Sequence, residues 1–422
     1  MRLTRAFALL VMLVAAMAFV ACGSSDDDSG SDSGSSGGAA TSTSSDEAST
    51  AAPTTGCGSI PQQMPEDPDG VLAALPKDVQ AAYNLFPQPV GKSAWADWKP
   101  AGDGPYKIYF SPGNISTPFI QDLQKEFDKL KASSDVITKV TTQDSNNNVQ
   151  TQIQQIRQAV REKYDLLIVL PLSPAADAPV LEAAGKAGIP IITPLNASAN
   201  EYVIGVEGNV ILNGASLGSG LVGIMGDKGN VLEMQGIPGV PASDDVLKGA
   251  DKVFAECSGI KVVGKPVGQF QPAVGKAQTL QFLSSHPGAV DGAIQTGGMA
   301  TGIIQAFQQT GRKVPPIADS GATPGALAYW NENKADYEGV ALGIAPAQFA
   351  DAMWNIALGL FEGRGVKVTD ILQEPLMITN DNLSEWVDPS WKLTTPIAYA
   401  PGPEGALLPE DYLDQFFSKP AS

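Results

Sequence analysis

The sequence is poor in the residues on which many catalytic and nucleic-acid-binding sites depend. It has one histidine, His286, and three cysteines in 422 residues. A hydrolytic triad would depend on that one imidazole, which lies in a Ser-Ser-His-Pro-Gly segment typical of a solvated turn. Basic residues are few, 27 against 45 acidic ones, for a formal net charge of -18. Because nucleic-acid binding needs clustered positive charge against phosphates, this composition argues against a nucleic-acid partner.

Sequence patterns for cofactor and metal sites are also lacking. There is no P-loop, no G-x-G-x-x-G after a strand, and no Cys/His cluster with metal-ligand spacing. Residues 214–218 (GASLG) match the hydrolase G-x-S-x-G pattern, but Ser216 lies inside a helical stretch instead of directly after a core strand. The oxygen-rich run 144–148 lacks the distal glutamate of a calcium loop, and we interpret it as a loop ending in a helix cap. We therefore expect no enzyme, no cofactor and no metal site.

No apolar run is long enough for a permanent membrane span. The longest, residues 6–21, is shorter than the roughly 20 residues that a spanning helix needs, and two arginines precede it. This pattern predicts an export signal over residues 1–21. The segment FVAC at 19–22 resembles a bacterial lipobox, with phenylalanine where leucine is usual, which implies cleavage before Cys22 and lipidation of its thiol. The alternative is an ordinary signal peptide that is cut near Ala21.

The segment that follows has no capacity to form a core. Residues 22–56 are almost all Ser, Gly, Asp, Ala and Thr, with acidic but no basic side chains. We interpret them as a disordered, self-repelling linker that tethers the folded part to a lipid anchor. The remaining cysteines, Cys57 and Cys257, lie beyond it. An exported chain meets oxidising conditions, so they either form a disulfide or remain two unrelated thiols, and only their distance decides this.

The folded part is long enough for two lobes. About 365 residues follow Gly56, which is more than one core usually accommodates. From Tyr106 onward, short β-branched apolar runs alternate with longer segments of helical period, which is typical of an α/β fold with parallel sheets. The loops that leave the carboxyl ends of such strands converge, so a ligand site is expected there. These loops begin at Ser111, Leu170, Pro194, Gln235, Gln295 and Asp319.

Short motifs occur in a fixed order over residues 106–378. They are YFS at 109–111, QDSNN at 143–147, DLLIV at 165–169, AGIPIIT at 187–193, LEMQGIPG at 232–239 and ADSG at 318–321. In this order the chain resembles the type I periplasmic solute-binding proteins of the ribose-binding group. The resemblance implies two doubly wound parallel-sheet lobes joined by three hinge segments, near 205–209, 343–348 and 374–379, which close on a solute.

Composition and resemblance together predict the domain boundaries. They are the signal peptide at 1–21, the linker at 22–56, an N-terminal extension at 57–105, lobe 1 at 106–207 and 345–374, and lobe 2 at 208–344 and 375–422. Lobe 2 includes the C-terminal tail, which we expect to wrap a lobe. In the extension, Trp95 and Trp98 are expected to pack on a lobe because large aromatic side chains are mostly structural.

The resemblance also implies a ligand site formed by loops of both lobes. The residues that it assigns are Asn114, Thr117, Phe119, Leu170, Asn196, Phe270, Thr296, Asp319 and Ile344. Two alternatives stay open: the two phenylalanines could belong to the core, and the aspartate could cap a helix. Family members that bind pyranoses usually have two ligand-clamping arginines, one of them at the position of Asn196, and this chain has neither. The resemblance therefore implies a less polar pocket, or one whose polar groups come from elsewhere, and a neutral ligand.

The predicted function is that of an extracytoplasmic substrate-binding lipoprotein of an ABC importer. It would act as a monomer that captures a sugar, a polyol or a similar neutral solute by hinge closure, driven by the higher affinity of the closed state. The expected partners are the permease and ATPase of the importer. The expected location is the outer face of the bacterial cell membrane, through the lipid on Cys22. The alternative is a lipoprotein that senses a ligand and signals to a membrane receptor without transport.

Overall fold

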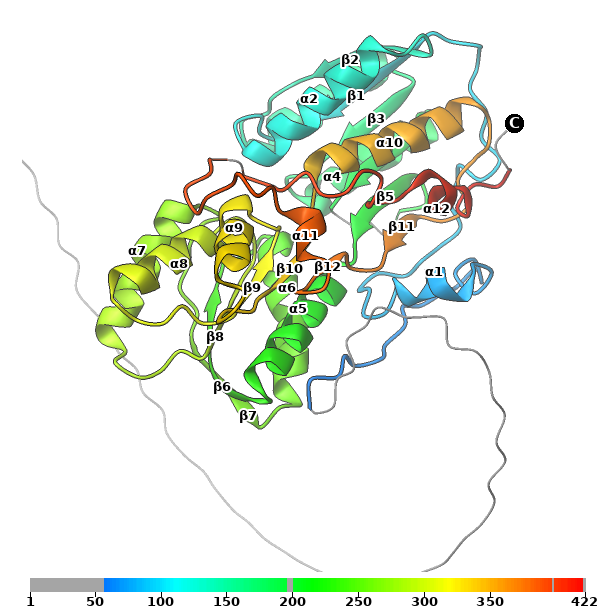
Figure 1. Cartoon of the computed structure of the whole chain (residues 1–422). Coiled ribbons are helices and arrows are strands. Elements are labelled where there is room, and N and C mark those ends of the chain that lie inside the picture. Colours follow the sequence, from blue (N-terminus) through cyan, green and yellow to red (C-terminus); the bar gives the residue numbers. More distant parts are fainter. Residues whose placement is uncertain (1–56, 196–199, 397, 420–422) are drawn as a thin grey trace, which may run out of the picture. The chain divides into compact units, whose positions relative to one another are not determined.

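The computed structural model describes residues 57–195, 200–396 and 398–419. Figure 1 shows two separate sheets, each flanked by helices. The predicted signal peptide, the linker with Cys22, and Asn196 lie outside the described residues. Strands and helices alternate along the chain and form two six-stranded sheets, which confirms the predicted α/β fold class.

The first sheet has the strand order β11-β5-β4-β3-β1-β2, and every neighbouring pair in it is parallel. Its strands are β1 (Tyr106–Ser111), β2 (Ile137–Thr142), β3 (Leu166–Val169), β4 (Ile191–Pro194), β5 (Val203–Gly208) and β11 (Asp370–Gln373). Its helices are α2 (Pro118–Ala132), α3 (Val149–Arg161), α4 (Pro174–Lys186) and α10 (Pro346–Phe361). The central strands β3 and β4 are buried along their whole length, which explains their continuous apolar runs.

The second sheet has the order β12-β10-β9-β8-β6-β7, and only the β10–β12 pair is antiparallel. Its strands are β6 (Lys228–Met234), β7 (Gly259–Gly264), β8 (Gly292–Gln295), β9 (Ile317–Ser320), β10 (Val340–Leu342) and β12 (Met377–Ile378). Its helices are α5 (Val210–Met225), α6 (Pro241–Ala255), α7 (Pro272–Ser285), α8 (Ala300–Gln309), α9 (Pro324–Asn333) and α11 (Leu383–Trp386). The two lobes therefore repeat one architecture.

The helix starts follow from the sequence. Proline occupies the first turn of α2, α4, α6, α7, α9 and α10, where its fixed φ suits the helix and its missing N–H is not needed. Asparagine caps two others: Asn148 Oδ1 accepts a hydrogen bond from Thr151 N at 2.9 Å, and Asn209 Oδ1 accepts one from Leu212 N at 3.1 Å. The first of these confirms the helix-cap interpretation of the oxygen-rich run before α3.

Three segments cross between the sheets where the sequence predicts hinges. β5 belongs to the first sheet, and α5, which follows directly, packs on β8, β9 and β10 of the second. β10 belongs to the second sheet, and α10, which follows it, packs on α2, β4 and β5 of the first. β11 and β12 then lie in different sheets only a few residues apart. Hinge closure between two lobes takes place at crossings of this kind.

The residues GASLG lie within α5, which confirms their helical interpretation, and the glycines among them allow a close contact with a second helix. A Cβ atom on Gly214 would lie 1.9 Å from the carbonyl oxygen of Val246 in α6, and one on Gly249 of α6 would lie 2.0 Å from the carbonyl oxygen of Ile211. The backbones of α5 and α6 are therefore in direct contact. This spacing accounts for the glycines without a nucleophilic role for Ser216.

The C-terminal tail differs from its predicted place. The sequence assigns all of residues 375–422 to lobe 2, and Trp386 and Ala400 do pack in a second-lobe cluster. However, Leu408 and Phe416 are buried in the core of the first lobe, next to α12 (Glu410–Asp414). The tail thus forms a fourth connection between the lobes, because α12 at its end packs against α10 of the first lobe.

The N-terminal extension also contacts both lobes. Tyr83, just after α1 (Lys77–Ala81), is buried in the first core, whereas Leu85 is buried in the second. Trp95 is 3 % exposed, and its Nε1 donates to the carbonyl oxygen of Tyr202 at 2.8 Å. Trp98 packs partly buried against the same core. Both tryptophans therefore pack on the first lobe, as expected of structural aromatic residues.

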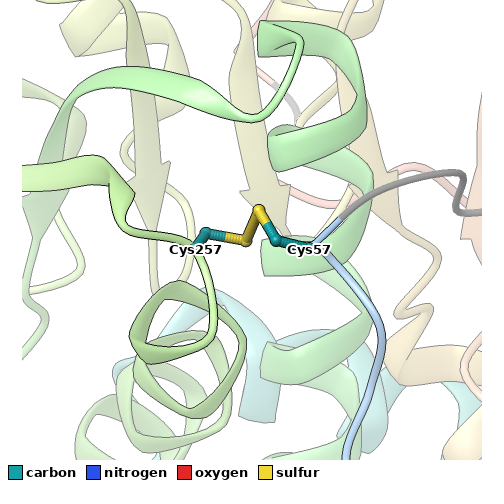
Figure 2. Close-up of a disulfide and its surroundings, with 2 residues drawn as sticks. All are labelled: Cys57 and Cys257. Atoms are coloured by element: carbon teal, nitrogen blue, oxygen red, sulfur yellow. A yellow bond between two sulfur atoms is a disulfide. The ribbon is translucent and has the colours of Figure 1, made fainter.

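Figure 2 shows that Cys57 and Cys257 form a disulfide. Their Cα atoms are 5.0 Å apart, within the range of disulfides, and Cys257 is 1 % exposed directly after α6. The bond fastens the start of the extension to the second lobe. Within the described ranges, no helix combines the length and hydropathy needed to span a bilayer.

Asp370 is a buried carboxyl group in the first lobe. It begins β11 opposite Gly205 of β5, is 1 % exposed, and its Oδ2 accepts a hydrogen bond from Thr369 Oγ1 at 2.7 Å. Among the described residues, its Oδ1 has no hydrogen-bond partner. Desolvation raises the pKa of this carboxyl from 3.8 to about 7. The fold therefore favours the protonated form.

We expect the protein to be more stable near pH 5 than near pH 8. Folding raises the pKa of Asp370, so the protonated side chain contributes to the free energy of unfolding. This contribution is fully present below the unfolded pKa of 3.8 and is lost as the pH rises through the folded pKa of about 7. At 1.36 kcal/mol per pKa unit, the loss between pH 5 and pH 8 is on the order of 2 to 3 kcal/mol. Urea unfolding at the two pH values measures it.

The matched variant is Asp370→Asn, which keeps the shape of the side chain and cannot ionise. Desolvation also raises the pKa of Asp319 to about 6 and of Glu233 to about 7, so these groups contribute with the same sign. The variant therefore isolates the contribution of Asp370 to the pH dependence of the unfolding free energy. If it shows the same difference in unfolding free energy between pH 5 and pH 8, the assignment to Asp370 is wrong.

Candidate ligand site

The predicted site residues lie mainly on the loops that leave the carboxyl ends of the strands. Asn114 and Thr117 follow β1, Leu170 follows β3, and Thr296 follows β8. Phe119 is in the first turn of α2, Phe270 lies between β7 and α7, Asp319 is in β9, and Ile344 lies between β10 and α10. Parallel pairing brings the carboxyl ends of neighbouring strands to one edge of each sheet.

Phe270 is placed over the loops of the second lobe. A Cβ atom on Gly236, after β6, would lie 2.2 Å from the Phe270 ring, and one on Gly297, after β8, would lie 3.2 Å from it. Phe270 itself has a φ of 56°, a conformation that non-glycine residues rarely adopt. The ring is half-buried. Glycine at both loops therefore allows an aromatic face to sit at the carboxyl edge of the sheet.

Asp319 is held by a network of its own lobe. Its carboxylate accepts hydrogen bonds from the Gln295 side-chain amide and, at 3.0 Å, from Thr323 N at the start of α9. Desolvation raises its pKa to about 6 in spite of these bonds. Gln295 Oε1 in turn accepts from Gly297 N at 2.6 Å. These contacts match the capping alternative for Asp319, and its contact with a ligand stays a prediction.

Thr296 has an unsatisfied hydroxyl. The residue is 4 % exposed, and within the described part of the chain its Oγ1 has no hydrogen-bond partner. A buried hydroxyl without a partner costs about 1 to 3 kcal/mol, so native structures usually provide one. The contact of Thr296 with a ligand stays a prediction.

In the first lobe, Asn114 and Thr117 carry the polar groups among the described site residues. Asn114 Oδ1 accepts from the backbone N and the hydroxyl of Ser116, at 2.8 and 2.6 Å, so this oxygen is engaged within its own loop. The Thr117 side chain is exposed and forms no cap on α2. Leu170 packs partly buried against the first core, and Ile344 packs against both cores. Because Leu170 and Ile344 are apolar, hydrogen bonds to a ligand would have to come from other residues.

The Phe119 ring is half-buried and meets two other aromatic rings. It lies 6.2 Å from the ring of Phe349 in α10 and 5.8 Å from the ring of Tyr399, in an edge-to-face arrangement with the latter. Sequence reasoning missed Tyr399, because it lies in the irregular tail, outside the strand–helix alternation. The only local signal is an aromatic residue in a proline-rich segment, which is not specific.

The charges around these residues are acidic. Desolvation and the nearby carboxylates of Asp122 and Asp319 raise the pKa of Tyr399 to about 12, so its hydroxyl keeps its proton at neutral pH. Among the described residues, no group of three or more His, Cys, Asp or Glu side chains is placed to hold a metal ion. Aromatic faces with hydroxyl, amide and carboxyl groups suit a neutral solute that carries hydroxyl groups.

Two six-stranded α/β lobes with convergent loops define a protein of the periplasmic-binding type. The family model of the periplasmic binding protein domain matches residues 108–364. The chain belongs to this family, and within it to the type I proteins of the ribose-binding group, which confirms the resemblance seen in the sequence. Members of the family are solute-binding proteins, not enzymes, and act outside the cytoplasm.

Individual relatives support the same assignment. The xylitol-binding protein of Mycolicibacterium smegmatis is 27% identical over 242 residues, which are 57% of this chain and 68% of that protein. The ribose import binding protein RbsB of Escherichia coli is 25% identical, over 52% of this chain and 74% of its own. A solved ABC transporter solute binding protein from Thermobispora bispora, 26% identical, has a TM-score of 0.60 and covers 71% of this chain and 91% of its own.

Proposed function

We propose that this protein is the extracytoplasmic substrate-binding lipoprotein of an ABC importer and that it captures a neutral sugar or polyol by hinge closure. The observation that carries the proposal is the carboxyl edge of the second sheet, where the Phe270 ring lies against Gly297, and where Thr296, the preceding residue, has a buried hydroxyl without a partner among the described residues. An aromatic face packs on the C–H face of such a solute, and a hydroxyl exchanges hydrogen bonds with its oxygens. Relatives named for xylitol and for ribose support this chemical class.

The proposed site comprises residues of both lobes, as the resemblance implies. We keep the predicted set and treat Phe119, Phe270, Thr296 and Asp319 as its centre. A solute that touches both lobes favours the closed arrangement over the open one, and this difference in affinity drives closure at the three crossings. The two parts that would move are the predicted lobes, except that the end of the tail, from Leu408 on, packs with the first lobe.

We further propose that the anchor is a lipid on Cys22 and that residues 22–56 act as a tether. The lipobox-like segment before Cys22 and the uncharged or acidic composition of the linker support this proposal. The partners would be the permease and ATPase of the importer. Mass spectrometry of the N-terminal peptide from membrane fractions tests the anchor, and an unmodified Cys22 would contradict it.

Binding is tested by the melting temperature of the mature chain in the presence of single solutes. We expect xylitol, D-ribose or myo-inositol to raise it, because a ligand that binds only the folded state at one hundred times its Kd stabilises by about 2.7 kcal/mol. Lysine and glutamate serve as charged controls of similar size. If a charged solute raises the melting temperature and no neutral sugar or polyol does, the proposed ligand class is wrong.

A further inference from the structure

The strap, which we define as residues 398–408 of the C-terminal tail, lies beyond the family match that ends at residue 364. It is fastened to both lobes. Ala400 N donates to the carbonyl oxygen of Ala322 in the second lobe at 3.1 Å. In the first lobe, Gln348 Nε2 donates to the carbonyl oxygens of Pro401 and Pro403, each at 2.8 Å. The strap is therefore fixed to both lobes, and Gln348 places it beside the crossing at 343–348.

The strap places Tyr399 between loops of the two lobes. In the second lobe, a Tyr399 ring carbon lies 3.6 Å from the position of a Cβ atom on Gly321, directly after β9. In the first lobe, the Tyr399 ring is 5.8 Å from the ring of Phe119, with an interplanar angle of 80°. Gly321 has a φ of 122°, so a larger residue is disfavoured there and the tyrosine ring can approach the loop.

The Tyr399 hydroxyl makes no hydrogen bond to another described residue, although it is largely buried. Thr296 Oγ1, on the neighbouring strand-end loop, is the second hydroxyl without a partner at this edge. Gly298, two residues after Thr296, approaches the same Gly321. Two unpartnered hydroxyls thus border one group of glycine loops, which is the arrangement that a polyhydroxylated solute would complete.

The predicted site residues of the first lobe add few polar groups, because Asn114 Oδ1 is engaged within its own loop and Leu170 and Ile344 pack against the cores. Polar contacts to a solute therefore have to come from other positions. We propose that Tyr399 is a ligand-contacting and specificity-determining residue: its ring covers the C–H face of a neutral sugar or polyol, and its hydroxyl donates a hydrogen bond to a ligand oxygen. This inference rests on the proposed function and extends it to a segment outside the family match.

Calorimetric titration of the mature chain with xylitol, D-ribose and myo-inositol tests the role of Tyr399. Tyr399→Phe keeps the ring and removes the hydroxyl, so we expect about tenfold weaker binding of the preferred probe and little change in the melting temperature without ligand. Tyr399→Ala also removes the aromatic face, and we expect a loss of about a hundredfold or more. The order of preference among the three probes should change in both variants.

Tyr412 in α12 provides the matched control. It lies in the same tail, and its hydroxyl donates to the carbonyl oxygen of Leu372 at 2.6 Å, within the first lobe. Tyr412→Phe should lower the melting temperature and leave the affinity unchanged. If Tyr399→Phe and Tyr399→Ala bind every probe as tightly as the unmodified chain, the inference is overturned and the proposed function stands. If the unmodified chain binds none of the probes, the proposed function fails, and the inference with it.

Discussion

Replacing Gly214 by alanine is expected to destabilise the protein by about 3 kcal/mol or more. The new methyl group would lie 1.9 Å from the carbonyl oxygen of Val246, which is backbone and cannot rotate away. Relief requires α5 and α6 to separate, and α5 also packs on the second sheet. Overpacking of a tight core costs about 1 to 3 kcal/mol, and a clash between two backbones belongs at or above the top of that range. Urea unfolding measures the change.

Gly223→Ala is the matched control for this prediction. It lies in the same helix, is exposed, and a Cβ atom there would meet nothing within 4 Å. Alanine is the better helix former, so we expect this variant to be unchanged or stabilised by about 0.5 to 1 kcal/mol. If the two substitutions change the unfolding free energy equally, the contact between α5 and α6 is not the reason for Gly214.

Loss of the disulfide is expected to destabilise the oxidised protein by as much as about 5 kcal/mol. The bond joins residues 200 positions apart, and in the chain-entropy model a cross-link over so long a segment removes much of the freedom of the unfolded chain. It also holds the extension against α5, where a Cβ atom on Gly58 would lie 3.1 Å from Val222. The midpoint of urea unfolding, with and without a reductant, measures the effect.

Cys57→Ser is the informative variant, because Cys57 is only partly buried whereas Cys257 is 1 % exposed and its replacement would also disturb packing. In this variant the reductant should no longer shift the midpoint. If the reductant still shifts the unfolding midpoint of Cys57→Ser, the disulfide is not the origin of the shift. If the reductant leaves the midpoint of the unmodified chain unchanged, the predicted contribution of the disulfide is wrong.

The strands show how accurately local sequence patterns predict secondary structure. The apolar residues LLIV within the motif at 165–169 coincide with β3, because a fully buried parallel strand needs an unbroken apolar sequence. The apolar residues from Val314 to Ala318 favour a strand by composition, but β9 begins only at Ile317. Pro315 and Pro316 explain the difference, since proline has no N–H for the sheet ladder. Such errors leave the fold class unchanged.

The site was less predictable than the fold. Asp319 was correctly placed at a strand end, but sequence could not show that Gln295 and Thr323 occupy its oxygens. Phe270 lies at the expected edge because Gly236 and Gly297 leave room for its ring. Side-chain partners of this kind depend on loops that are far apart in sequence, and no periodicity carries that information.

The sequence by itself determined the features that depend on local order. Alternating apolar and helical segments gave two parallel α/β lobes, and short motifs in a fixed order gave the family. Only the tertiary structure decided that Cys57 meets Cys257, that the tail divides between the lobes, and that Tyr399 reaches Phe119. The physical reason is that helix and strand propensity and the apolar pattern can be read from residues that are neighbours in sequence. The contacts named above join distant segments, and their distances are set only when the segments pack against one another.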